Sequence, residues 1–318
     1  MPPIDRSLRR KLYFRAQSVR LNRCFAPSGN CEQSAIRAHS VQNGTVMSLL
    51  QVNGHVKTPR YSLTRSDTFV PSWEDAGRNL ATTFEGFCSR HDTEVFRPID
   101  TRPFNPDDEE QLFLYAYRSV SRELHASMEA AARLQAGYQG SIEAGIDSGN
   151  QPEEVGMRAF DQMFVSYATY EYKENLDAAL LKRDFGILKH RVLVLGDQPP
   201  AIAVSTCFNL AGVTERDDWP RLSLNVFPLS SQESVAIFSY VSQDLAPVKH
   251  QIDPIFNAGG HYQKYLISRL ILGNAENFVA SPALFSTWSE EKKDKILKFF
   301  VQTLQLDSSE ESEHLYLF

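Results

Sequence analysis

Three of the four cysteines lie in the first 90 residues, and a histidine follows the third of them at the spacing of a metal-ligand pair. Cys24 and Cys31 bracket a loop of Pro, Ser, Gly and Asn, and two residues separate Cys88 from His91. A two-residue spacing lets both side chains reach one ion from a turn that enters a helix. Zinc prefers four tetrahedral nitrogen and sulfur ligands, so these four residues predict a structural zinc site.

The alternative is that Cys24 and Cys31 are unrelated thiols, because six residues between two ligands is longer than usual for zinc. The chain is expected to be cytoplasmic, since its start lacks the apolar core of a secretory signal and no apolar run could span a membrane. Thiols stay reduced there, which favours metal ligation over disulfides. Cys207 lies in an apolar segment and is expected to be a core residue.

From about residue 20 to residue 100 the chain resembles the HNH endonucleases, whose ββα-metal core is a treble-clef zinc finger. The resemblance rests on the Cys pair, then His39 in an apolar strand, then a long insertion, then Asn79-Leu80 and Phe87-Cys88-x-x-His91-Asp92-x-x-x-Phe96. It implies that His39 activates water and that Asn79 orients this histidine. It also implies that Asp92 holds a catalytic Mg or Mn ion, which stabilises the scissile phosphate and the leaving oxygen.

Ala38 departs from the family pattern, because the family carries an acidic metal ligand just before the catalytic histidine. His91 could bind the catalytic metal instead of zinc, or His55 or another residue of the insertion could supply the missing ligand. The fold could also persist without catalysis. Two functions therefore stay open. One is a metal-dependent HNH-type endonuclease acting on DNA or RNA, for which the resemblance suggests phage defence or toxicity. The other is a catalytically inactive zinc-finger scaffold that binds nucleic acid or protein.

The charge is distributed unevenly along the chain. Residues 1–105 contain 15 Lys and Arg against nine Asp and Glu, whereas residues 106–318 contain 18 against 30. A basic arm leading into a metal module would suit a phosphate backbone, which predicts a nucleic-acid partner. The alternative is a solvated basic helix face that binds nothing. The basic residues of the arm are Arg6, Arg9, Arg10, Lys11, Arg15, Arg20 and Arg23.

Three prolines near residue 100 separate two expected domains, an HNH-like zinc-binding module over 1–105 and an α+β domain over 106–318. Apolar residues at spacings of three and four predict long helices over 106–136 and 152–188. Alternating apolar segments within 190–241 predict a small antiparallel sheet, and closing helices are expected within 261–304. The expected class is α+β, and the second domain would serve a protein partner or homo-oligomer without contacting a membrane.

Overall fold

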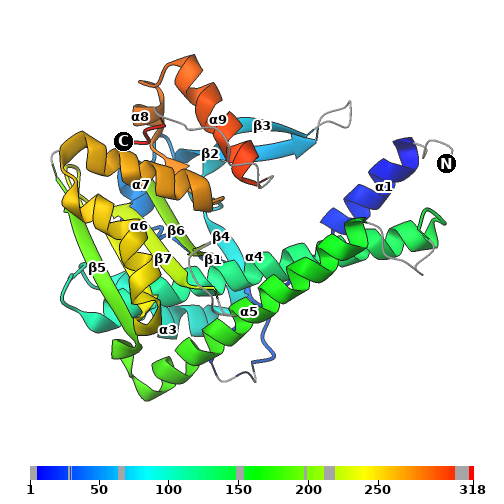
Figure 1. The fold of residues 1–318 in the computed structure, drawn as a ribbon, viewed down its shortest axis with the longest axis horizontal. Helices are drawn as coiled ribbons and strands as arrows, with labels where there is room; N and C mark the ends of the chain where they lie inside the picture. Colours follow the sequence, from blue (N-terminus) through cyan, green and yellow to red (C-terminus); the bar gives the residue numbers. More distant parts are fainter. Residues whose placement is uncertain are drawn as a thin grey trace.

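The computed structural model describes residues 6–27, 29, 31–63, 69–147, 154–196, 199–210, 219–304 and 315–318. The chain is an α+β protein with antiparallel sheets (Figure 1). None of the described helices is long and apolar enough to cross a membrane. The first half contains α1 (Arg6–Gln17), β1 (Ile36–His39), α2 (Val46–Leu50), β2 (His55–Leu63), β3 (Phe69–Gly77), β4 (Thr83–Phe87), α3 (Ser89–Thr101), α4 (Glu109–Glu143) and α5 (Glu154–Lys182).

The second half contributes most of the larger sheet and the helices beside it. Its elements are η1 (Phe185–Ile187), β5 (Leu188–Leu195), β6 (Ile202–Asn209), β7 (Arg221–Pro228), β8 (Ser234–Val241), η2 (Ser242–Asp244), α6 (Leu245–Asn257), α7 (Gly260–Asn274), β9 (Val279–Ala280), α8 (Pro282–Phe285) and α9 (Glu290–Leu304). The four strands expected within 190–241 are therefore confirmed as β5 to β8, while α6 was not predicted.

Among the described residues, the larger sheet has seven strands in the order β3-β2-β9-β6-β7-β8-β5, and each neighbouring pair is antiparallel. It is larger than the small sheet expected from the sequence, because β9 joins β6 to the β2–β3 hairpin. Ala280 lies opposite Ile202 on one side and Lys57 on the other. Strands β2 and β3, which lie within the insertion after His39, thus share a sheet with strands from the second half of the chain.

Both faces of this sheet are covered, which explains why every residue of β7 is buried. Leu222, Leu224 and Val226 belong to the core cluster that includes residues of α6 and α7, whereas Phe227 packs in a separate cluster with residues of α2 and α4. This alternation follows from the two-residue period of a strand. The long helices α4 and α5 run side by side and extend beyond the sheet (Figure 1).

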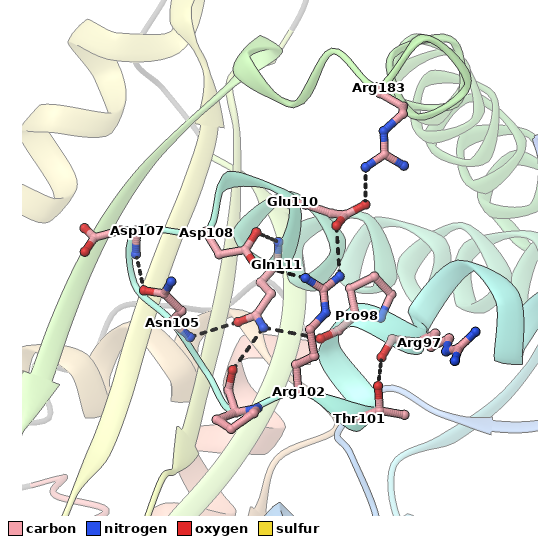
Figure 2. Close-up of polar contacts among 11 residues, drawn as sticks. Arg97, Pro98, Thr101, Arg102, Asn105, Asp107, Asp108, Glu110, Gln111 and Arg183 are labelled. Carbon is pink, nitrogen blue, oxygen red and sulfur yellow. Dashed lines mark hydrogen bonds and ion pairs between the residues drawn. The ribbon is translucent and has the colours of Figure 1, made fainter.

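The helix expected from residue 106 begins three residues later, at Glu109, because Asn105 forms a turn and does not cap the helix. The Asn105 side chain accepts a hydrogen bond from the Asp107 N–H, and Asp108 becomes the cap by accepting from the Gln111 N–H. Gln111 also donates to the carbonyl of Pro98 (Figure 2). It donates to the carbonyl of Pro103 as well. These bonds hold the end of α3 against the start of α4.

The helix expected over 152–188 ends at Lys182. Arg183 has a φ of 55°, a left-handed conformation that terminates the helix, and its guanidinium donates to Glu110 (Figure 2). β5 then begins at Leu188. Arg102 donates to the same carboxylate, so Glu110 links α4 to the ends of both α3 and α5.

Candidate metal centre

The structure brings the four predicted zinc ligands together. Cys24 and Cys31 lie in the segment before β1, Cys88 is the N-cap of α3, and His91 lies in the first turn of α3. Their three sulfurs and the His91 ring nitrogen all lie within 4.8 Å of one another. The two pairs, far apart in sequence, therefore form one cluster that could hold a metal ion such as zinc.

Three of the distances within the cluster are close to those expected around one tetrahedral ion. The Sγ atoms of Cys24 and Cys88 each lie 3.3 Å from Nδ1 of His91, and Sγ of Cys31 lies 3.7 Å from Sγ of Cys88. Ligands at zinc bond lengths occupy tetrahedral corners about 3.4–3.8 Å apart. Four protein donors leave no open position for water, which is the arrangement of a structural site.

Protonation of the cluster would change when a cation binds. Burial raises the pKa of Cys24 to about 11, although N–H groups of Cys88 and Ala26 oppose this shift, so the thiol is protonated at neutral pH without a cation. Arg90 lies 3.0 Å from Nε2 of His91, and a guanidinium only donates hydrogen bonds. A metal on Nδ1 would place the ring proton on Nε2, so the exposed Arg90 side chain would have to turn away.

The first ligand loop, which is the segment that carries Cys24 and Phe25, is held against the end of β4 by hydrogen bonds. The Phe25 N–H donates to the Gly86 carbonyl at 2.7 Å, and the Cys88 N–H donates to Sγ of Cys24 at 3.3 Å. A Cβ at Gly86 would lie 2.5 Å from the Phe84 ring and 3.2 Å from the Phe25 ring. Glycine is therefore required here for the loop, the strand and the aromatic rings to approach this closely.

Lys173 on α5 also holds the first ligand loop, and the sequence analysis did not identify it. Its ammonium donates to the Phe25 carbonyl at 2.7 Å, to the Tyr117 hydroxyl at 2.9 Å and to Asp177 at 2.6 Å. The side chain is almost fully buried, and burial lowers the pKa of Lys173 while Asp177 opposes this shift. The only sequence signal was a Lys and an Asp four residues apart on a helix, which usually marks a surface pair.

His39 lies at the end of β1, opposite Thr83 of β4, and is half-buried. Its Nε2 lies 3.2 Å from the Arg78 carbonyl. A carbonyl only accepts, so Nε2 carries the proton and Nδ1 keeps its lone pair. Burial lowers the pKa of His39, so the ring is neutral at pH 7.

Asp92 occupies the first turn of α3, as expected, and its Oδ1 is buried without a hydrogen-bond partner. Burial raises the pKa of Asp92, and the positive charge of Arg118 opposes this shift. Arg118 forms a two-point ion pair with Asp100 at 2.9 and 2.7 Å and affects the pKa of His39 as well. His39 and Asp92 therefore lie within electrostatic reach of the same ion pair.

The other residues considered for catalysis lie around these two. Asn79 is exposed and accepts from the Asn43 amide at 3.0 Å, while its neighbour Arg78 supplies the carbonyl beside His39. Ala38 is buried, and His55 is exposed at the start of β2. Within the described part of the chain, the four-residue cysteine and histidine cluster is the only group of three or more such ligands close enough to share an ion.

The basic arm is partly neutralised by α4. Arg15 pairs with Glu143 at 2.5 Å, and Arg20 lies 3.8 Å from Glu129. These contacts place α1 against the C-terminal half of α4. The predicted nucleic-acid contact of the arm therefore depends on its other basic residues, of which the side chains of Arg6 and Arg9 lie outside the described set.

Comparison with known proteins found no matching family model, no matching curated protein and no matching solved structure.

Proposed function

We propose that this chain is an HNH-type endonuclease whose N-terminal residues form a ββα module around a structural zinc ion. The observation that carries the proposal is the order of β1, β4 and α3 around the cluster. The antiparallel β1–β4 pair carries His39 at the end of its first strand. The helix that follows it begins with Cys88 and His91 and carries Asp92 one position later.

His39 has the protonation state that a general base needs. Its Nε2–H is held by the Arg78 carbonyl, so Nδ1 would accept a proton from a water molecule attacking a phosphodiester. The depressed pKa keeps the ring neutral at physiological pH. The Arg78 carbonyl would have the orienting role that the family resemblance assigned to Asn79.

A catalytic divalent ion would have few protein ligands here. Ala38 offers none, which leaves the unpaired Asp92 oxygen as the protein donor. Mg²⁺ commonly binds through one or two carboxylates together with substrate phosphates and water, so a single carboxylate is compatible with such an ion. When bound, the ion would supply charge stabilisation to the phosphate.

A second candidate function is that of a zinc-finger scaffold without catalysis. Ala38 favours it, because this residue is 2% exposed and packs opposite Phe84 where an acidic metal ligand would be needed. Such a scaffold would still bind zinc and a nucleic-acid or protein partner.

Digestion of plasmid DNA and of RNA separates the two candidates. The full chain should cut at least one substrate with Mg²⁺, Mn²⁺ or Ni²⁺, and His39→Ala should lose about 100-fold or more of this activity because it removes the general base. His250→Ala replaces an exposed histidine on α6 and should cut like the wild type.

Zinc content and thermal midpoint of each variant should match those of the wild type, which shows that the module is still folded. If His39→Ala cuts as well as the wild type, or if no substrate is cut while zinc is bound, the endonuclease proposal is wrong and the scaffold is favoured.

A further inference from the structure

A cavity of about 600 Å³ lies away from the cysteine cluster, between α5 and the ends of two strands of the large sheet. Opposite α5 it is lined by Asn209 at the end of β6, Trp219 just before β7, Arg221 at the start of β7 and Asp244 of η2. Its size is that of a site for a small molecule. None of these lining residues belongs to the cysteine and histidine cluster.

Exposed aromatic side chains line the cavity both from α5 and from the segment before β7. Phe164 and Tyr167 on α5 are each 59% exposed, and Trp219 is 63% exposed. Exposed apolar side chains that gather in one groove are typical of a site for a ligand or a partner. Their ring faces carry negative electrostatic potential, which attracts cations.

Negative charge exceeds positive charge in the same lining. Asp161, Glu171 and Asp244 contribute carboxylates, and Arg221 is the single basic residue among the described side chains of the lining. Arg221 is already engaged in the cavity wall, because its guanidinium donates to the Thr169 hydroxyl at 3.1 Å and its backbone N–H donates to Asp244 at 3.0 Å. The cavity therefore disfavours phosphates and carboxylates and favours a positively charged ligand.

An unpaired acceptor supports the same ligand chemistry. The side-chain oxygen of Asn209 is buried and has no hydrogen-bond partner. Buried polar atoms are nearly always paired, so an orphaned acceptor in a cavity wall indicates a missing N–H or O–H donor. A ligand that carries both positive charge and N–H groups would satisfy the acceptor and the carboxylates together.

We propose that this cavity binds an organic cation with N–H donors, an alkylammonium or guanidinium group. The cationic end would lie against Phe164, Tyr167 and Trp219, with Asp161 and Glu171 beside it. The group could belong to a free amine or to a basic side chain of a peptide. This site is independent of the zinc cluster and of nuclease activity.

Calorimetric titration of the full chain tests the proposal. The probes are agmatine and spermidine as free cations and acetyl-Gly-Arg-Gly-amide as a peptide, with adenosine and AMP as neutral and anionic comparators. The cations should bind, and binding should weaken as NaCl rises from about 0.05 M to about 0.5 M because salt screens charge. Tighter binding of agmatine than of the peptide would indicate a free amine, and the reverse order would indicate a protein side chain.

Two exposed residues provide variants that should still fold. Asp161→Asn and Trp219→Leu should each weaken cation binding about fivefold, which corresponds to losing one partly exposed charge or cation–π contact. Glu74→Gln removes an exposed acid on β3, outside the cavity lining, and should bind cations like the wild type. The proposal is overturned if no cation binds, if adenosine or AMP binds more tightly, or if both cavity variants bind unchanged.

Discussion

Cys88 combines two roles at the scale of single residues. Its sulfur is one of the four donors of the cluster, and its backbone N–H donates to the sulfur of Cys24. A serine at this position would keep the backbone bond but replace a soft thiolate with a hydroxyl, which is a poor zinc ligand at neutral pH. Metal binding by the cluster would therefore depend on this sulfur.

We predict that the wild-type chain contains about one zinc ion and that Cys88→Ser loses it and is less soluble, as structural zinc often supplies much of a small module's folding free energy. Elemental analysis of the purified proteins measures this directly. Cys207→Ala is the matched control, because Cys207 is a buried thiol of β6 outside the cluster and its loss should leave the zinc content unchanged. Zinc retained by Cys88→Ser would contradict the assignment of the cluster.

His190 on the edge strand β5 gives a pH-dependent prediction. Burial lowers its pKa from 6.5 to about 4, and Lys189 adds to this shift. The His190 ring therefore binds a proton more readily in the unfolded chain than in the folded one. As a result, the free energy of unfolding decreases as the pH falls from 6.5 towards 4. Over this range the wild type should lose about 2 kcal/mol more than His190→Asn in denaturant unfolding.

The matched control variant for this measurement is His250→Asn, because His250 is exposed on α6. That variant should keep the pH dependence of the wild type. Equal pH dependence of the wild type and His190→Asn would show that the ring of His190 is not responsible.

Sequence spacing identified the four donors, because a metal site requires particular atoms at particular separations. It could not identify Lys173, whose role depends on the Phe25 carbonyl 148 residues away. A buried lysine can be identified only from the groups around it, and these come together only in the folded chain.

At the scale of elements, the ligand loop depends on its fit against β4. Gly86→Ala would insert a methyl group against the Phe84 and Phe25 rings. We predict a loss of about 1–3 kcal/mol of stability, typical of overpacking, together with faster zinc release to a chelator. Gly77→Ala is the control, since a Cβ at the end of β3 meets open space. Matching chelation rates for the two variants would contradict the proposed fit.

The strands β5 to β8 and most of α4 were predictable, because their apolar periodicity extends over many residues. The expected end of α4 was wrong, since the helix expected to stop at residue 136 continues to Glu143. The end of α5 was not predictable either, since the apolar pattern continues beyond Lys182 while Arg183 adopts a left-handed conformation. β9 contains two residues, which is too short for any periodic signal. Its pairing with β2 and β6 is set by tertiary packing rather than by local propensity.

At the scale of the whole molecule, that short strand decides how the two halves are connected. The expected boundary near residue 105 separates residues that share the large sheet, because the β2–β3 hairpin pairs with β9. Trp73 of β3 strengthens this connection. Its indole N–H donates to the Lys293 carbonyl at 3.2 Å, and its ring lies 5.1 Å from Phe285 and 5.7 Å from Trp288.

Because the hairpin belongs to the sheet, we predict that the zinc module and the sheet unfold together. Heating the wild type should give one transition in which the loss of circular dichroism and the release of zinc to a chromogenic chelator coincide. Trp73→Ala should lower the free energy of unfolding by about 3 kcal/mol, the cost of truncating a packed tryptophan, and should shift both signals to the same lower temperature. Trp219→Ala, at an exposed position, should shift neither by more than about 0.5 kcal/mol. A shared sheet cannot lose one edge without exposing the core beneath it. Zinc release at a temperature well below the main unfolding transition would therefore contradict the prediction and mean that residues 1–105 unfold as a separate unit.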